Sequence, residues 1–274
     1  MRTRFLIVLC LSLAPNAALA KMAAGSDVEP HMRIVMGRTP TASPAALPQG
    51  MEPSIGAVGP APTEEPAAAR PGITVALTLD ACSGAVDDRI LSVLVDNRIP
   101  ATIFATHRWI RRNPAALATL LAHPDLFEIE NHGDQHVPAV TDHPTVFGIR
   151  TAGTIDEVKA EVEGGSAAVR TATGRKPHWF RGATARYSLD AVAEIEAEGY
   201  AVAGYSLNAD MGASLPAEQV ARRIAAARDG DVIIAHINQP KRASGAGVAA
   251  GVLALHRAGA KFVRLDDVVI EAAK

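Results

Sequence analysis

The sequence predicts an α/β protein whose mainly parallel sheet is closed or nearly closed. From residue 72 onward, short apolar or β-branched runs alternate with amphipathic helical runs, the pattern of repeated strand–helix units. Polar side chains gather where several of these strands end. About 200 residues carry the pattern, a length that suits a small barrel formed by one domain.

Seven strands are expected, and a helical pattern follows each of them. The predicted strands cover 73–79, 101–105, 126–130, 178–181, 201–206, 231–235 and 261–264. The predicted helical runs cover 87–98, 113–122, 154–170, 188–198, 216–228, 245–258 and 266–273. Polar residues suited to N-caps open most of these runs, namely Asp87 or Asp88, Asn113, Thr154, Ser188 or Asp190, and Asp266. Glycines suited to ending helices in the left-handed conformation are Gly199, Gly230 and Gly259.

The first 20 residues have the features of a secretory signal peptide. Arg2 and Arg4 precede an apolar run, and Ala18-Leu19-Ala20 forms an A-x-A cleavage site. The apolar run is shorter than the roughly 20 residues that span a bilayer, although an uncleaved anchor is an alternative. We therefore expect a periplasmic or secreted protein without a membrane span after cleavage. Residues 21–71 are rich in Pro, Ala and Gly and are interpreted as a flexible tether, and residues 72–274 as the catalytic domain. Within the tether, the slightly more apolar stretch from Val28 to Gly37 is a candidate for local packing.

Composition excludes several kinds of partner. The formal net charge of −2 gives no basic footprint for nucleic acid and no polybasic patch for anionic lipid. Aromatic residues make up 4% of the chain, too few for a broad aromatic platform that binds sugars. Removal of the signal peptide leaves Cys82 as the only cysteine, which excludes an internal disulfide.

Six residues at strand ends are candidates for one site. Asp80 ends the run ITVALTLDACSG, and His132 and His136 directly follow LFEIE. The others are Arg181, Asp210 and His236. Strand ends of a parallel barrel share one face, so these side chains are expected to converge. Two imidazoles completed by a carboxylate or water are typical of a zinc-like site.

At these residues the chain resembles the polysaccharide deacetylases of carbohydrate esterase family four, including the nodulation-type chitooligosaccharide deacetylases. The resemblance covers about residues 72–265, and five motifs follow the family's order. TLDACSG stands where the family has T-F-D-D-G, HGDQH matches H-[ST]-x-x-H, and FRGAT matches R-x-P-x-G. LNADMG matches the fourth motif, which contains an Asp, and IIAH matches Leu-x-His.

The resemblance implies a distorted (β/α)7 barrel that removes N-acetyl groups from polymers containing N-acetylglucosamine. It implies that Asp80 is the general base, and that His132 and His136 bind a divalent metal, zinc or another ion such as cobalt. Arg181 corresponds to the arginine that orients the base, and His236 to the general acid. Asp210, with Asn208 as the alternative, corresponds to the carboxylate that tunes this histidine. Ile234 corresponds to the residue that lines the pocket for the acetyl methyl group.

The sequence departs from the family pattern where a metal ligand is expected. Ala81 replaces the second Asp, the family's metal carboxylate. Cys82 is either a substitute thiolate ligand or a small buried residue, and Asp80 or Asp134 are further candidates for the vacant role. The second histidine motif has Gly133 for Ser or Thr, the third lacks its Pro, and Met211 stands where Trp is usual.

We therefore expect an exported, metal-dependent hydrolase that acts on an N-acetylated glycan, either peptidoglycan or another envelope polymer. Ala81 motivates an alternative, a hydrolase of another amide or a cyclic imide on the same scaffold, with or without a metal. A third alternative is a glycan-binding protein whose catalytic site is weakened.

Overall fold

The computed structural model describes residues 27–40 and 72–272. The predicted signal peptide, and the parts of the predicted tether at 21–26 and 41–71, lie outside the described residues.

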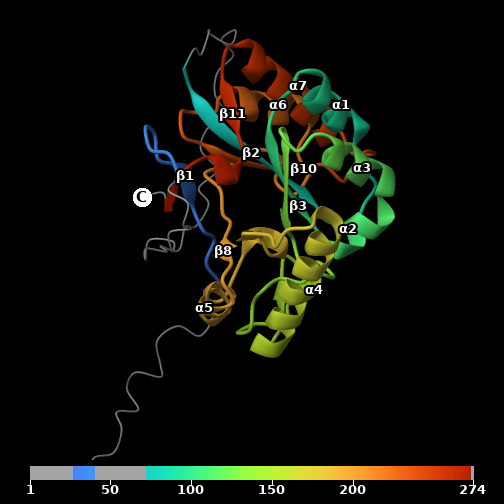
Figure 1. The fold of residues 1–274 in the computed structure, drawn as a ribbon, viewed down its shortest axis with the longest axis vertical. Coiled ribbons are helices and arrows are strands. Elements are labelled where there is room, and N and C mark those ends of the chain that lie inside the picture. The colour runs from blue at the N-terminus through green and yellow to red at the C-terminus, as the bar shows by residue number, and fades with distance from the viewer. Residues whose placement is uncertain (1–26, 41–71, 273–274) are drawn as a thin grey trace, which may run out of the picture.

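A curled parallel sheet forms the centre of the structure (Figure 1). Its strands run in the order β8-β7-β4-β3-β2-β10-β9, and β11 pairs with the start of β2. The strand bounds are β2 (Thr74–Ala81), β3 (Ala101–Ala105), β4 (Phe127–Asn131), β7 (Trp179–Phe180), β8 (Ala201–Val202), β9 (Leu207–Asn208), β10 (Val232–His236) and β11 (Lys261–Val263). Every pair in this sheet is parallel, so the predicted α/β fold is confirmed.

One chain segment joins the two edges of the sheet. The predicted strand at 201–206 is observed as two short strands, β8 and β9, separated by residues 203–206. Ala203 N–H donates to the Phe180 carbonyl on one edge (2.8 Å), and Ser206 N–H donates to the Val232 carbonyl on the other (2.9 Å). Because the same segment hydrogen-bonds to both edges, the sheet curls into the distorted barrel that the family resemblance implies.

Helices cover the outside of the sheet (Figure 1). They are α1 (Asp88–Asp96), α2 (His107–Arg112), α3 (Pro114–Ala122), α4 (Ile155–Thr173), α5 (Leu189–Ala197), α6 (Ala217–Ala225) and α7 (Ser244–Arg257). The side chains of Asp87 and Thr154 accept N-cap hydrogen bonds, as predicted. The short helix α2 was not predicted, although the Thr106 hydroxyl caps it. Gly199 and Gly259 follow the C-caps of α5 and α7 and have φ values of +83° and +94°, as expected of residues that end helices. Gly230 also has a φ of +83°, but it lies in a turn beyond the end of α6.

Two apolar layers hold the barrel together. The larger layer lies between the strands and the helices and includes Leu79, Ala81 and Ile103. The second fills the inside of the barrel and includes Met32, Phe104 and Ile234. Successive side chains of a strand point to opposite faces, so each strand supplies both layers. This alternation decides which residues reach the site at the carboxyl end of the strands.

Residues 27–40 correct the predicted tether. Within this segment β1 (Met32–Ile34) pairs antiparallel with β12 (Ile270–Ala272), and Val28 bridges to Tyr187. Met32 and Ile34 are buried, with exposures of 1% and 5%. Val28, Met32 and Ile34 supply the apolar surface of the stretch that was a candidate for local packing, and this part of the chain packs into the domain.

The predicted helix at 266–273 is wrong. A single 3-10 turn (Leu265–Asp267) is followed by the strand β12. Val35 N–H donates to the Val269 carbonyl (2.8 Å), and β1 pairs with the residues that follow. The β-branched run Val268-Val269-Ile270 suits this pairing, and the distant segment 32–35 decides the outcome. A separate hairpin, β5 (Thr145–Val146) and β6 (Ile149–Arg150), precedes α4.

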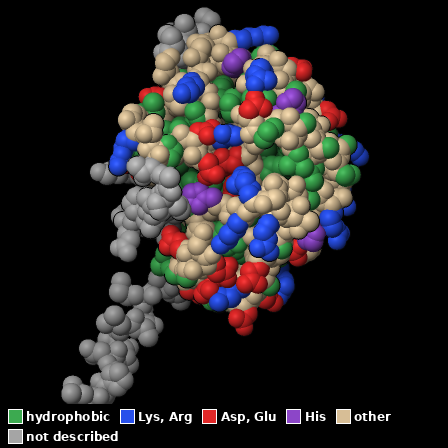
Figure 2. All heavy atoms as spheres, viewed as in Figure 1, with side chains coloured by type: hydrophobic (Ala, Val, Ile, Leu, Met, Phe, Trp, Pro, Cys, Tyr) green, Lys and Arg blue, Asp and Glu red, His purple; other side chains and the backbone are tan. Residues whose placement is uncertain are grey.

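On the face shown in Figure 2, positive and negative side chains are interspersed. Among the described residues, no helix combines the length and the apolar character needed to cross a bilayer.

Candidate functional site

The six polar residues predicted for one site lie at the carboxyl end of the barrel. Asp80 and His236 are register partners on the neighbouring strands β2 and β10. His132 directly follows β4, and Arg181 directly follows β7. Asp210 stands two residues after β9 and contacts His236. Their common location follows from the parallel direction of the strands.

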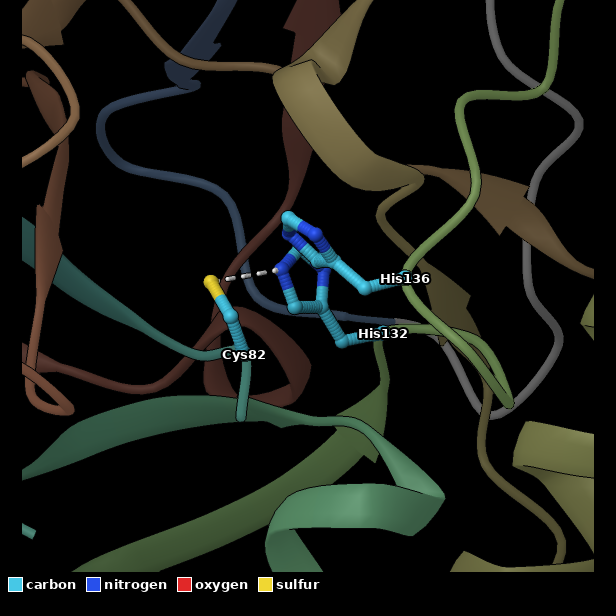
Figure 3. Close-up of side chains that lie close together, drawn as sticks. All are labelled: Cys82, His132 and His136. Atoms are coloured by element: carbon cyan, nitrogen blue, oxygen red, sulfur yellow. Dashed lines mark hydrogen bonds between the residues drawn. The ribbon is translucent and has the colours of Figure 1, made fainter. Parts of the chain in front are cut away.

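Cys82, His132 and His136 point toward one another (Figure 3). Each offers one ligand atom, and these atoms all lie within 4.8 Å of one another. Cys82 Sγ lies 3.6 Å from His132 Nε2. Tetrahedral zinc bonds of about 2.3 Å to sulfur and 2.0–2.1 Å to nitrogen place these two ligand atoms about 3.6 Å apart. The donor set therefore fits a zinc-like ion with one thiolate and two imidazoles.

The orientation of His132 suits a metal ligand. Its Nδ1 lies 2.6 Å from the Arg181 carbonyl oxygen. A carbonyl oxygen only accepts, so Nδ1 carries a proton, and Nε2 is the ring nitrogen that faces Cys82 and Asp80 and is available to a metal. Metal-binding histidines commonly donate their second ring N–H to a carbonyl or carboxylate in this way. The ring is 1% exposed, so the surrounding structure holds this orientation.

His136 is presented by a tightly clamped loop. Its φ of +65° is unusual for a residue with a side chain, and Gly133 has a φ of +89°. The buried carboxylate of Glu161 on α4 accepts hydrogen bonds from Gln135 N (2.9 Å) and Val137 N (3.0 Å). A Cβ at Gly133 would fall 2.2 Å from Glu161 Oε1. The close approach of Glu161 therefore explains why glycine replaces the family's Ser or Thr.

Arg181 is fully buried and holds Asp80. Its Nη1 donates to Asp80 Oδ1 (3.0 Å) and to Thr78 Oγ1 (2.8 Å), and Nη2 donates to the Gly204 carbonyl (2.7 Å). The guanidinium also lies over the Phe104 ring, 4.2 Å from its centroid. Burial alone would raise the pKa of Asp80, but His132 and Arg181 outweigh burial and lower it. Asp80 is therefore an ionised carboxylate at neutral pH.

Asp210 orients His236 and raises its pKa. Asp210 Oδ1 lies 3.0 Å from His236 Nδ1, and Oδ2 accepts from the His236 backbone N–H (2.8 Å). Burial alone would lower the pKa of His236, but the Asp210 carboxylate outweighs it and raises this pKa well above the usual value. Asn208 instead accepts a hydrogen bond from Met211 N. The geometry therefore favours Asp210 over Asn208 as the partner of His236.

The surroundings of Cys82 favour its thiolate. Burial alone would raise the pKa of the thiol, but His136, His132 and His236 outweigh it and hold the pKa well below its usual value. The Thr106 hydroxyl bonds to the Cys82 carbonyl and anchors the turn after β2. A thiolate is the form that binds metals, so the electrostatics agree with the ligand geometry.

Of the two other candidates for the missing carboxylate, Asp80 lies beside the cluster, with Oδ2 3.7 Å from His132 Nε2, and Asp134 lies elsewhere. Ala81 is fully buried in the layer between strands and helices, so a carboxylate on its Cβ would enter that layer. Asp134 accepts from His107 (2.6 Å between Nδ1 and Oδ1) and from Gln135, on the outer side of its loop. Ile234 is buried inside the barrel, two residues before His236 on β10. Its contact with a substrate stays a prediction.

Supporting residues around the cluster were missed by the sequence analysis. The sequence around Glu161 does not indicate its role, because a glutamate on an amphipathic helix is ordinarily a solvent-facing residue. Arg108 donates to the Gln135 carbonyl (3.2 Å), and Arg112 donates to the Ser83 carbonyl (2.7 Å). Helix α2 therefore ties together the two loops that carry Cys82 and His136.

The chain belongs to the polysaccharide deacetylase family. The sequence profile of this family matches residues 67–203, half of the chain. A comparison with curated protein sequences found no match.

Solved structures that are similar to this chain include deacetylases and members of carbohydrate esterase family 4. One is described as a pseudoenzyme of that family from Bacillus anthracis, with 18% identity, TM-score 0.56, and coverage of 73% of this chain and 66% of that chain. Another is PdaA of Bacillus subtilis, a family 4 carbohydrate esterase, with 19% identity, TM-score 0.56, and coverage of 71% and 80%. A third, described as T48 deacetylase with substrate, has 22% identity, TM-score 0.56, and coverage of 74% and 95%. These likenesses establish the fold.

Proposed function

We propose that this protein is an exported, metal-dependent hydrolase that removes N-acetyl groups from a glycan containing N-acetylglucosamine, such as peptidoglycan or another envelope polymer. One arrangement carries the proposal. An ionised carboxylate, Asp80, and a protonated imidazole, His236, occupy neighbouring strand ends beside the cluster of Cys82, His132 and His136. Amide hydrolysis needs a base for water and an acid for the leaving amine. The family membership supplies the substrate class.

In this proposal each residue has a distinct role. Asp80 accepts a proton from the attacking water, and Arg181 keeps it ionised and directed toward the cluster. His236, protonated through Asp210, donates a proton to the departing amine nitrogen. Cys82, His132 and His136 hold the divalent ion, which polarises the acetyl carbonyl when it is bound. Thiolate and imidazole ligands favour zinc.

The alternatives have weaker support. The argument for a metal-independent hydrolase is that Ala81 leaves the site without its third metal ligand. Cys82 lies beside both histidines and offers a third ligand, so this argument no longer holds. The glycan-binding protein with a weakened site draws on the pseudoenzyme among the similar structures. The hydrogen-bonded pairs Arg181–Asp80 and Asp210–His236 favour an enzyme, because glycan binding alone requires neither pair.

Acetate release tests the proposed activity. Protein dialysed against a chelator is incubated with N-acetylglucosamine oligomers and with peptidoglycan, with and without added zinc or cobalt. We expect acetate only with metal, and a loss of at least about 100-fold in kcat for Asp80→Asn and for His236→Ala. His178→Ala is the matched control, because His178 also pairs with an aspartate but precedes β7 at the opposite end of that strand. Equal rates in both active-site variants and the wild type would refute the assigned roles.

Spectroscopy of the cobalt form tests the ligand set independently of activity. With Cys82 bound, the cobalt protein should show a thiolate-to-metal charge-transfer band in the near ultraviolet. Cys82→Ala should lose this band and retain less than one zinc per chain after dialysis. A band that survives in Cys82→Ala would exclude the thiolate, and His132→Ala provides the comparison for loss of an imidazole ligand.

A further inference from the structure

The amino-terminal segment at 27–40, here called the strap, docks on the barrel at the gap between β8 and β9. It lies outside the region that matches the family profile. Tyr205 N–H donates to the Pro30 carbonyl (3.1 Å), and Met32 N–H donates to the Tyr205 carbonyl (3.2 Å). The strap therefore supplies the backbone partners of Tyr205, between Ala203 and Ser206, which bond to the two edges of the sheet.

Gly204 is the point of closest approach. A Cβ at this position would fall 1.7 Å from the Pro30 carbonyl oxygen, and the three nearest atoms all belong to Pro30. The Gly204 N–H faces Met32 Sδ at 2.6 Å. The strap thus contacts Gly204 through Pro30 and Met32, while the Gly204 carbonyl accepts a hydrogen bond from Arg181.

The contact continues from Gly204 to the site. Arg181 Nη2 donates to the Gly204 carbonyl (2.7 Å), and Nε approaches the Ala203 carbonyl at 3.5 Å. Its remaining hydrogen bonds go to Thr78 and Asp80. A fully buried guanidinium requires partners for its N–H groups, so its position depends on where these two carbonyls are held. In a regular strand the carbonyls of Ala203 and Gly204 would accept hydrogen bonds from the neighbouring strands, and both would not face the Arg181 guanidinium.

We propose that the strap completes the active site from outside the family region: Pro30 and Met32 hold residues 203–206 in the broken conformation whose carbonyls position Arg181 against Asp80. Pro30 and Met32 are positioning residues that act through the backbone of Gly204. The activity readouts below rest on the proposed function, whereas the spectroscopic readout does not.

Kinetics of full-length variants give the first test. Met32→Ala removes the strap's buried contact with Gly204, and Gly204→Ala drives the strap away from the same point. Met36→Ala is the matched control, because Met36 lies in the strap but is 46% exposed. We expect about a tenfold loss or more in kcat for the first two variants, with KM within about twofold, because the strap aligns the base without touching the glycan. Unchanged kcat in both would overturn the proposal.

A double-mutant cycle separates positioning from general destabilisation. If the strap acts through Arg181, Gly204→Ala should change kcat less than about twofold in an Arg181→Gln background. Multiplicative losses in the double variant would mean that the strap acts independently of Arg181, which would overturn the proposal. Rates are compared well below the unfolding midpoint of each variant. If Gly204→Ala does not fold, Met32→Ala takes its place in the same cycle.

An NMR signal tests the positioning without any substrate. The Arg181 Nε–H resonance, identified by its absence in Arg181→Lys, should shift or exchange faster with solvent in Met32→Ala and Gly204→Ala. It should not change in Met36→Ala. An unaltered resonance in the first two variants would overturn the proposal even if the wild-type enzyme is active. If the wild type releases no acetate from any glycan, the proposed function fails, and this resonance still decides whether the strap positions Arg181.

Discussion

Ala81 and Cys82 show how one strand end divides its side chains between two environments. Leu79 and Ala81 are part of the apolar layer under the helices. Asp80 and Cys82 lie on the other side, within reach of His132, with exposures of 4% and 8%. Alternation along an extended chain therefore turns Cys82 toward the cluster and turns Ala81 away from it. Position 81, where the family has its metal carboxylate, and Cys82 are therefore adjacent in sequence but lie in different environments.

Ala81→Asp is therefore expected not to restore a metal carboxylate. The new charge would enter the apolar layer unpaired, and we expect the free energy of unfolding to fall by roughly 3–5 kcal/mol. Cys82→Asp is the comparison, because it places the same carboxylate beside His132 and should retain bound zinc. Urea unfolding and zinc content per chain measure both effects. A stable Ala81→Asp protein that binds more zinc than the wild type would contradict this assignment.

Asp210→Asn is expected to change the pH dependence of activity. His236 must be protonated to act as an acid, so activity is lost as pH rises through its pKa. Asp210 raises that pKa, so removal of its charge should move the alkaline limb of the kcat profile to lower pH. Asp266→Asn, which alters the partner of His178, should leave the limb in place. An alkaline limb at the same pH in Asp210→Asn would disprove the link between Asp210 and His236.

At the scale of single elements, β4 carries two buried glutamates into the barrel. Glu130 accepts from Arg175 Nη2 (2.8 Å) and from the backbone N–H groups of His178 and Trp179. Glu128 accepts from the Asp266 N–H (3.1 Å). Burial raises the pKa of Glu130 to about 7. Burial also raises the pKa of Glu128 well above its usual value, and Asp266 and Glu130 add to that shift.

These glutamates should make the fold less stable as pH rises from about 5 to 8. A carboxyl group whose pKa is raised by folding binds a proton that the unfolded chain releases, so its stabilising contribution is complete at low pH and is lost through the folded pKa. For Glu130, a rise from 4.5 to about 7 corresponds to roughly 3 kcal/mol. Glu128→Gln should reduce this slope, whereas the exposed Glu157→Gln should not. Urea unfolding at pH 5 and pH 8 measures how the free energy of unfolding changes with pH. The same change in Glu128→Gln as in the wild type would contradict the role given to the buried Glu128 carboxyl.

At the scale of the whole molecule, the strap makes the barrel and its amino-terminal segment one packed unit. Its backbone bonds to residues 187, 205, 230 and 269 connect it to four distant parts of the chain. Arg33 adds an ion pair with Asp231 (2.7 Å). Because these contacts bury apolar side chains as well as backbone groups, the strap is expected to unfold together with the barrel.

Hydrogen exchange measures this cooperativity. The amides of Val28, Met32 and Ile34 should be protected to a degree similar to those of the central strands β2 and β3. Gly37 N–H, just beyond the paired residues, should exchange faster and serves as the internal comparison. Fast exchange of Met32 and Ile34 while β2 and β3 stay protected would show that the strap opens independently.

The sequence by itself determined the parallel α/β class, six of the seven helices among the described residues, and the set of polar residues at the strand ends. These follow from local periodicity, from caps such as Asp87 and Thr154, and from the rule that parallel strands end on one face. Helix α2 was missed because its six residues are too short to show a period.

Only the tertiary structure decided which residues complete the site. Cys82 joins His132 and His136 because of the direction of its side chain after β2, which a motif comparison does not contain. Glu161 and Gly204 act through neighbours that are distant in the chain, the loop at 135–137 and Pro30 respectively. The strap was mistaken for part of a tether because its partners lie more than 150 residues away, as in the Met32–Ala272 pair. Local sequence patterns report propensity and periodicity, whereas these contacts depend on which distant surfaces meet when the barrel closes.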